Sequence, residues 1–150
     1  MLLTHLHAGT LGFITLSIVA GAFLMYTEGR TVPERAAATT RNLGFALAGS
    51  VMLYIVAFVS TQGILRPLAG TLVFIAVAWL FVWIIGRMRG HALTIAQLGV
   101  FLAFVSLVLG AIFGILLGIF VSEGEIPGLP EEAGTRIGEA HPGTMVIGYL

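Results

Sequence analysis

The sequence predicts an all-α protein, a polytopic bundle of transmembrane helices, and two observations lead to this prediction. Apolar residues make up 58% of the 150 residues and charged residues only 9%, with a mean hydropathy of +1.05, whereas a soluble domain carries about 25% charged residues. The chain also contains long stretches without Asp, Glu, Lys or Arg. About 20 apolar residues in a helix cross the roughly 30 Å hydrocarbon core of a bilayer. We therefore expect an integral membrane protein whose main partner is the lipid bilayer.

Four apolar runs have bilayer length, and polar or Gly/Pro-containing segments separate them. The first run ends before TEGRTVPERAAATTRN, the second before the turn around Gly63 and Pro67, and the third at GRMRGH. The four predicted helices cover residues 6–26, 43–61, 69–86 and 92–121.

The composition changes after the fourth predicted helix. Residues 122–140 are rich in Gly, Pro and Glu, which predicts an extramembrane loop or a short surface helix. A fifth helix is expected to begin at about His141, where only ten residues remain, too few to span a bilayer. We expect residues 1–150 to form a single transmembrane domain that is the N-terminal portion of a longer protein.

The arginines predict the orientation of the helices. All seven basic residues are Arg, and the predicted topology places five on one side (Arg30, Arg35, Arg41, Arg87 and Arg89) and two on the other (Arg66 and Arg136). The positive-inside rule then places the N-terminus outside the cell membrane, with a bacterial inner membrane as the expected location. Scattered arginines form no basic patch, which excludes nucleic acid as a partner.

A short motif, His-x-Gly-Thr, occurs twice, in HLHAGTLGF at 5–13 and in EAHPGTMVIG at 139–148. Both copies are expected at helix starts on the same face of the membrane, so that the glycine leaves room beside the imidazole ring. Imidazole is a common ligand of haem iron and copper, and two histidines from different helices suffice to hold a haem. The candidate cofactor-binding residues are His7, Gly9, Thr10, His141, Gly143 and Thr144.

His5 is a further candidate metal ligand beside His7 and His141. On a continuous helix His5 and His7 point to opposite faces, whereas in extended backbone they lie on one side. The alternative interpretation is that each histidine is an amphipathic residue at the membrane interface and that the glycines only permit close packing.

Three glycines repeat at every fourth position in the last long apolar run, GAIFGILLG. This small-xxx-small pattern is typical of close helix packing in lipid, and it involves Gly110, Gly114 and Gly118. It supports a second hypothesis, a non-catalytic membrane subunit or scaffold that binds other subunits or forms an oligomer through helix 92–121. A third hypothesis, a small transporter, is weaker because the chain has no Asp and all seven Glu lie in loops or at the edges of the spans.

At THLHAGTLGFITL and AHPGTMVIGYL the chain resembles the haem-copper oxidase subunit I superfamily and its NnrS-like relatives. This resemblance implies a longer helix bundle in which histidines on separate helices bind haem or copper towards the outer face, with His7 and His141 at the corresponding positions. The His-Pro-Glu-Val and His-His elements of the oxidases are absent from the sequence. The resemblance therefore implies a redox or electron-transfer protein and not oxygen reduction by this chain alone.

Overall fold

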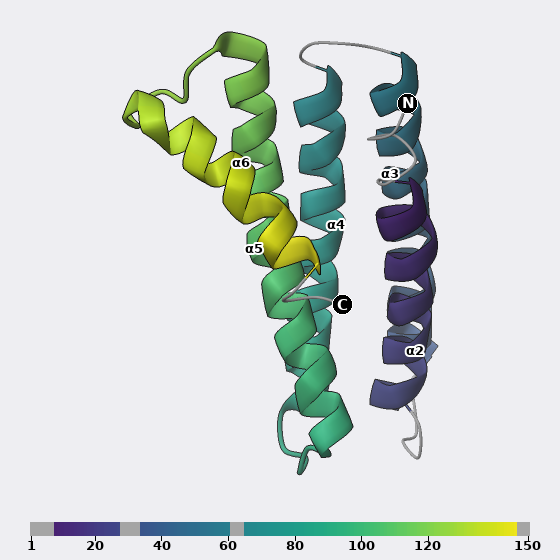
Figure 1. The fold of residues 1–150 in the computed structure, drawn as a ribbon. Helices are drawn as coiled ribbons and strands as arrows, with labels where there is room; N and C mark the ends of the chain where they lie inside the picture. The colour runs from purple at the N-terminus through teal and green to yellow at the C-terminus, as the bar shows by residue number, and fades with distance from the viewer. Residues whose placement is uncertain (1–7, 28–33, 61–64, 147–150) are drawn as a thin grey trace.

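The computed structural model describes residues 8–27, 34–60 and 65–146, and in these ranges all regular structure is helical (Figure 1). A π-helix, η1 (Ala8–Thr15), continues directly into α2 (Leu16–Thr27). The helices α3 (Glu34–Ser60), α4 (Leu65–Met88) and α5 (Ile95–Glu123) follow, and α6 (Glu131–Val146) is the last. The all-α prediction is confirmed.

Four helices are long and apolar enough to cross a membrane, by length and composition. They cover Gly9–Thr27, Glu34–Val59, Leu65–Met88 and Ile95–Val121. Successive long helices run antiparallel, and α6 then runs back obliquely across α5 (Figure 1). This arrangement agrees with the predicted architecture of an integral membrane helix bundle.

The core of the bundle consists of apolar side chains from all four long segments. Tyr26, Leu43, Leu80, Ile84 and Phe104 are fully buried. Large apolar side chains also cover the outside, among them Phe13, Phe45, Val82 and Leu102. Exposed apolar surface of this extent is costly in water and is the ordinary lipid-facing surface of a membrane bundle.

Several Ser and Thr hydroxyl groups within the spans donate to carbonyls of their own helical segment, as the absence of water in a bilayer core requires. Thr15 is buried, and its Oγ1 donates to the carbonyl oxygen of Thr10 at 2.8 Å, five residues earlier. Ser17 and Thr71 donate to the carbonyls of Phe13 and Pro67, each four residues earlier.

Two helices, α3 and α6, begin nine and ten residues before their predicted starts. The second long helix was expected at 43–61, but α3 begins at Glu34. Residues 34–41 are polar, but they include the strong helix formers Ala36–Ala38, so the helix extends beyond its apolar part. A search for apolar runs detects only the part of a helix that faces lipid.

The prediction that a fifth helix begins near His141 is wrong, because α6 already begins at Glu131. Gly124 and Gly128 adopt left-handed conformations, with φ of 81° and 80°, and reverse the chain after α5. The amide of Ala133 then donates to the carbonyl of Pro130. The negative charge of Glu132 in the first turn of α6 interacts favourably with the positive end of the helix dipole. Residues 131–140, predicted as part of an extramembrane loop or a short surface helix, are therefore helical and belong to a helix that lies against α5.

Candidate functional site at the contact between α5 and α6

His141 is the one histidine of the repeated motif whose structure is described, and it lies inside α6 rather than at a helix start. Its Nδ1 lies 2.9 Å from the carbonyl oxygen of Gly110. Gly110 is buried near the middle of α5 (Ile95–Glu123). The ring is therefore placed at the mid-length of a membrane-spanning helix, and not near the outer end as expected.

The carbonyl contact determines the chemistry that His141 can perform. A carbonyl oxygen only accepts hydrogen bonds, so Nδ1 must carry a proton to bond to it. In the neutral imidazole the lone pair then resides on Nε2, the arrangement in which metal-binding histidines are commonly oriented by a backbone carbonyl. The tautomer that this bond selects is one that imidazole ligands can adopt.

Gly114 provides the surface against which the imidazole packs. A Cβ atom added at Gly114 would lie 3.0 Å from Cε1 of His141, closer than ordinary van der Waals contact. The glycine that makes room for the ring is therefore on α5. By contrast, a Cβ at Gly143, the glycine of the motif itself, would meet nothing within 4 Å.

Thr144 does not point to a ligand in this structure. Its Oγ1 donates to the carbonyl of His141 at 2.9 Å and lies 3.3 Å from the carbonyl of Ala140. The hydroxyl thus supplies the local hydrogen bond that is common for Thr in apolar helices. This bond lies next to Pro142, which has no backbone N–H to donate.

The remaining contact between α5 and α6 depends on two glycines of α6 that the sequence analysis did not select. A Cβ at Gly134 would collide with the ring of Phe120, and one at Gly138 would lie 3.6 Å from Cδ1 of Leu117. Large residues of α5 thus face glycines of α6, while His141 faces glycines of α5. The spacing of four residues between Gly134 and Gly138 could have indicated this helix contact. The surrounding stretch, however, has too many polar residues for a membrane helix to be expected there.

The glycine repeat of α5 contacts two different neighbours within the chain. Gly110 and Gly114 face His141 of α6. A Cβ at Gly118 would instead lie 3.6 Å from Cβ of Pro67 in α4. All three residues predicted for helix packing therefore lie at intramolecular contacts.

The described residues of the first motif lie on a different part of the bundle. Gly9 is exposed, and a Cβ there would meet nothing within 4 Å, while the carbonyl of Thr10 accepts the bond from Thr15. Among the described elements η1 contacts α2 and α3, whereas α6 contacts α5. The structure therefore does not bring Gly9 and Thr10 together with Gly143 and Thr144; His5 and His7 lie outside the described residues.

Within residues 8–27, 34–60 and 65–146, no group of three or more His, Cys, Asp or Glu side chains could hold a metal ion. Comparison of the chain with protein-family models, with curated proteins and with solved structures finds no match in any of the three.

Proposed function

We propose that this integral membrane protein binds haem or a copper ion through His141 and acts in electron transfer. The observation that supports the proposal is the bond between Nδ1 of His141 and the carbonyl of Gly110, which leaves Nε2 as the ligating nitrogen of a neutral ring. Burial of an imidazole at the mid-length of a membrane-spanning helix costs free energy unless the ring has hydrogen-bond or ligand partners. Ionisable residues at this depth usually have a function.

The second ligand in this proposal is His7, with His5 as the neighbouring candidate. Both residues precede η1, which packs against α2 and α3. The proposal requires the side chain of one of them to extend to His141. Imidazole nitrogens bind metals at about 2 Å, so both rings must approach one atom closely. The proposal keeps the N-terminus on the outer side of the membrane, in agreement with the arginine distribution.

The proposal is tested by the absorption spectrum of the purified protein after expression with added haem, together with copper analysis of the same sample. We expect a reduced-minus-oxidised haem band or about one copper ion per chain in the wild type. The variants His141→Ala and His7→Ala should lose the haem band or the copper ion. His91→Ala is the matched control, because His91 is exposed at the opposite end of the bundle and should retain the cofactor. A wild type without haem or copper overturns the proposal.

A second candidate function is a non-catalytic membrane subunit, and a separate observation favours it. Glu132, Arg136 and Glu139 are exposed on α6, which lies along the apolar helix α5. Lipid solvates such charges poorly, so further protein or a water-filled space is expected beside them. Native mass spectrometry from lipid nanodiscs tests this alternative. The measured mass should then correspond to more than one chain and should include no bound cofactor.

A further inference from the structure

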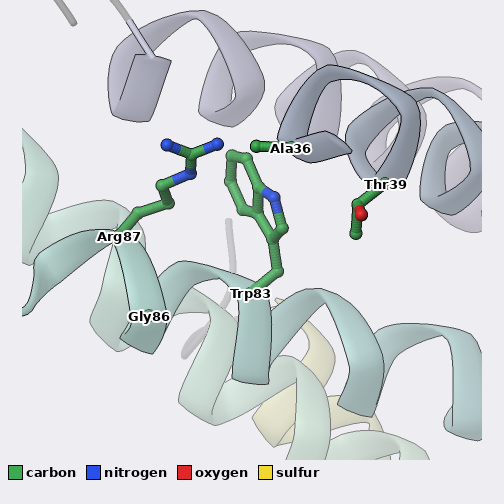
Figure 2. A pocket seen from close by; sticks show the side chains of 5 residues that line it. All are labelled: Ala36, Thr39, Trp83, Gly86 and Arg87. Carbon is green, nitrogen blue, oxygen red and sulfur yellow. The ribbon is translucent and has the colours of Figure 1, made fainter. Parts of the chain in front are cut away.

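A pocket lies between the first turns of α3 and the last turns of α4, far from His141. It has a volume of about 330 Å³ and is lined by Ala36, Thr39, Trp83, Gly86 and Arg87. Figure 2 shows the indole of Trp83 and the guanidinium of Arg87 projecting from α4 towards α3, with Ala36 and Thr39 opposite them. Since α3 starts at Glu34 and α4 ends at Met88, the pocket lies at one end of these two candidate membrane spans.

The positive charge of this pocket, on Arg87, lies over the aromatic ring of Trp83. The guanidinium carbon of Arg87 lies 5.4 Å from the centre of the Trp83 ring, within cation–π distance. Trp83 is itself buried and packs edge-on against Phe23, with ring centroids 5.1 Å apart. The position of the positive charge is therefore determined by side-chain packing.

The surroundings of the pocket are positively charged. Arg35, Arg41 and Arg89 are exposed at the same end of the bundle, and Glu34 is the one acidic residue in the described parts of α3 and α4. This imbalance favours an anionic ligand. A guanidinium presents several N–H donors in a planar fork that matches a phosphate group.

An apolar strip on the outside of α4 continues from the pocket towards the middle of the membrane. Ile75, Trp79 and Val82 are exposed at spacings of four and three residues, and Gly86 follows four residues later. These residues lie on one face of the helix. Gly86 also lines the pocket, and a Cβ there would meet nothing within 4 Å, so the strip ends at open space within the pocket, the recess at Gly86.

We infer that the pocket binds the phosphate headgroup of an anionic phospholipid, with an acyl chain lying along Ile75, Trp79 and Val82. Arg87 binds the phosphate, and the recess at Gly86 accepts the glycerol. The pocket volume of about 330 Å³ is large enough for a phosphate group and part of the glycerol. The apolar strip distinguishes a lipid from free phosphate, because phosphate alone would gain nothing from it.

The experiment measures the melting temperature of the detergent-purified protein while phosphatidylglycerol or phosphatidylcholine is added. We expect phosphatidylglycerol to stabilise the wild type more than phosphatidylcholine does. Arg87→Gln should bind phosphatidylglycerol about fivefold more weakly, the effect of one basic residue beside an anionic lipid. Gly86→Leu should abolish the preference by filling the recess while all charges remain.

Two matched controls separate the pocket from general effects of charge and size. Arg89→Gln removes an exposed charge two residues from Arg87 and should retain the preference. Gly49→Leu makes the same glycine substitution at an exposed position of α3 that has open space around it, and should also retain it. Circular dichroism of each variant confirms that the helices are intact, and a variant that loses them is replaced by Arg87→Lys or Gly86→Val.

Three results would overturn the inference. One is a wild type that does not distinguish the two lipids. Another is an equal loss of preference in Arg89→Gln and Arg87→Gln, which would indicate a diffuse charge effect. The third is equal stabilisation by inorganic phosphate, which would indicate that the pocket takes free phosphate rather than a lipid.

Discussion

Nδ1 of His141 lies 2.9 Å from the carbonyl oxygen of Gly110, and this bond joins the end of α6 to the middle of α5. The carbonyl of a residue within a helix already accepts the amide four residues later, so the imidazole uses its second lone pair. No other side chain of α6 makes a hydrogen bond to α5 among the described residues for which bonds are given. The bond therefore helps to position α6 along α5, together with the packing of Gly134 and Gly138 against α5.

Replacing His141 with Leu should lower the free energy of unfolding by about 0.5–1.5 kcal/mol, because the variant loses one hydrogen bond and leaves a similar volume beside Gly114. Unfolding in mixed micelles with increasing dodecyl sulfate measures the change. His91→Leu is the control, since His91 is exposed and its side chain has no described partner in the bundle. An equal effect of both substitutions would contradict the role assigned to the bond.

Gly134 should tolerate no side chain, because a Cβ there collides with the ring of Phe120. Gly134→Val should destabilise the contact between α5 and α6 by about 1–3 kcal/mol, the usual cost of overpacking. The double variant Gly134→Val with Phe120→Ala should recover part of the loss, since the colliding ring is gone. Gly138→Ala is the matched control on the same helix face, because its Cβ would lie at an ordinary 3.6 Å from Leu117. Protease resistance of α6 and the micelle unfolding midpoint both report the effect.

The four long helices could be predicted from the sequence because crossing lipid imposes a minimum apolar length on each of them. The same criterion missed the polar start of α3, where nothing requires an apolar residue. It also missed α6, whose contact with α5 is made by Gly134, Gly138 and His141 rather than by a periodic apolar face. The absence of side chains at Gly134 and Gly138 permits this close contact, and a hydropathy profile gives no indication of it.

The candidate site could be predicted only in part for a related reason. The repeated His-x-Gly-Thr motif drew attention to His141, which contacts α5, but the similarity to residues 7–10 suggested a helix start at both copies. In the structure Thr10 belongs to a helix start and Thr144 to the last turns of α6. A short motif does not determine the position of its residues within a helix, because neighbouring segments decide where the helix begins.

Tyr26 and Gln97 should stabilise the bundle by joining the end of α2 to the start of α5. The Tyr26 hydroxyl donates to the carbonyl of Gln97 at 2.6 Å, and Nε2 of Gln97 donates to the carbonyl of Met25 at 3.1 Å. Gln97 also caps α5, because its Oε1 accepts from the amide of Thr94. Tyr26→Phe should cost about 0.5–1.5 kcal/mol, and Gln97→Ala should cost more because it removes both the cap and the bond to Met25. Ser17→Ala, which removes a hydroxyl bonded only within its own helix, should leave the micelle unfolding midpoint nearly unchanged.

Arg66 should stabilise the opposite end of the bundle. Its Nη2 donates to the carbonyl of Phe58 at 3.1 Å, and its guanidinium carbon lies 4.6 Å from the centre of the Phe58 ring. A cation near the last carbonyls of α3 also interacts favourably with the helix dipole. Arg66→Gln should therefore lower the free energy of unfolding by roughly 1–2 kcal/mol. Arg136→Gln should have no measurable effect on the unfolding midpoint, because its pair with Glu132 is exposed at the surface.

Single cysteines should reveal which ends of the helices share a side of the membrane, and the natural chain has no cysteine to interfere. Arg35 and Arg89 are exposed at one end of the bundle, and Glu125 is exposed in the turn after α5 at the other. A membrane-impermeant maleimide applied to intact cells should label Glu125→Cys, whereas Arg35→Cys and Arg89→Cys should react only after the membrane is opened.

The expected sides follow from the arginine distribution, since loops rich in Arg stay in the cytoplasm during insertion. Labelling with the two sides exchanged would contradict the orientation but keep the helix order. Labelling of Arg35→Cys and Glu125→Cys from one side would contradict the four-span topology itself, because α3, α4 and α5 cross the bundle three times between these positions. Arg89→Cys adds a check on α3 and α4: if both span the membrane, position 89 lies on the side of position 35, and if one of them does, it lies on the opposite side.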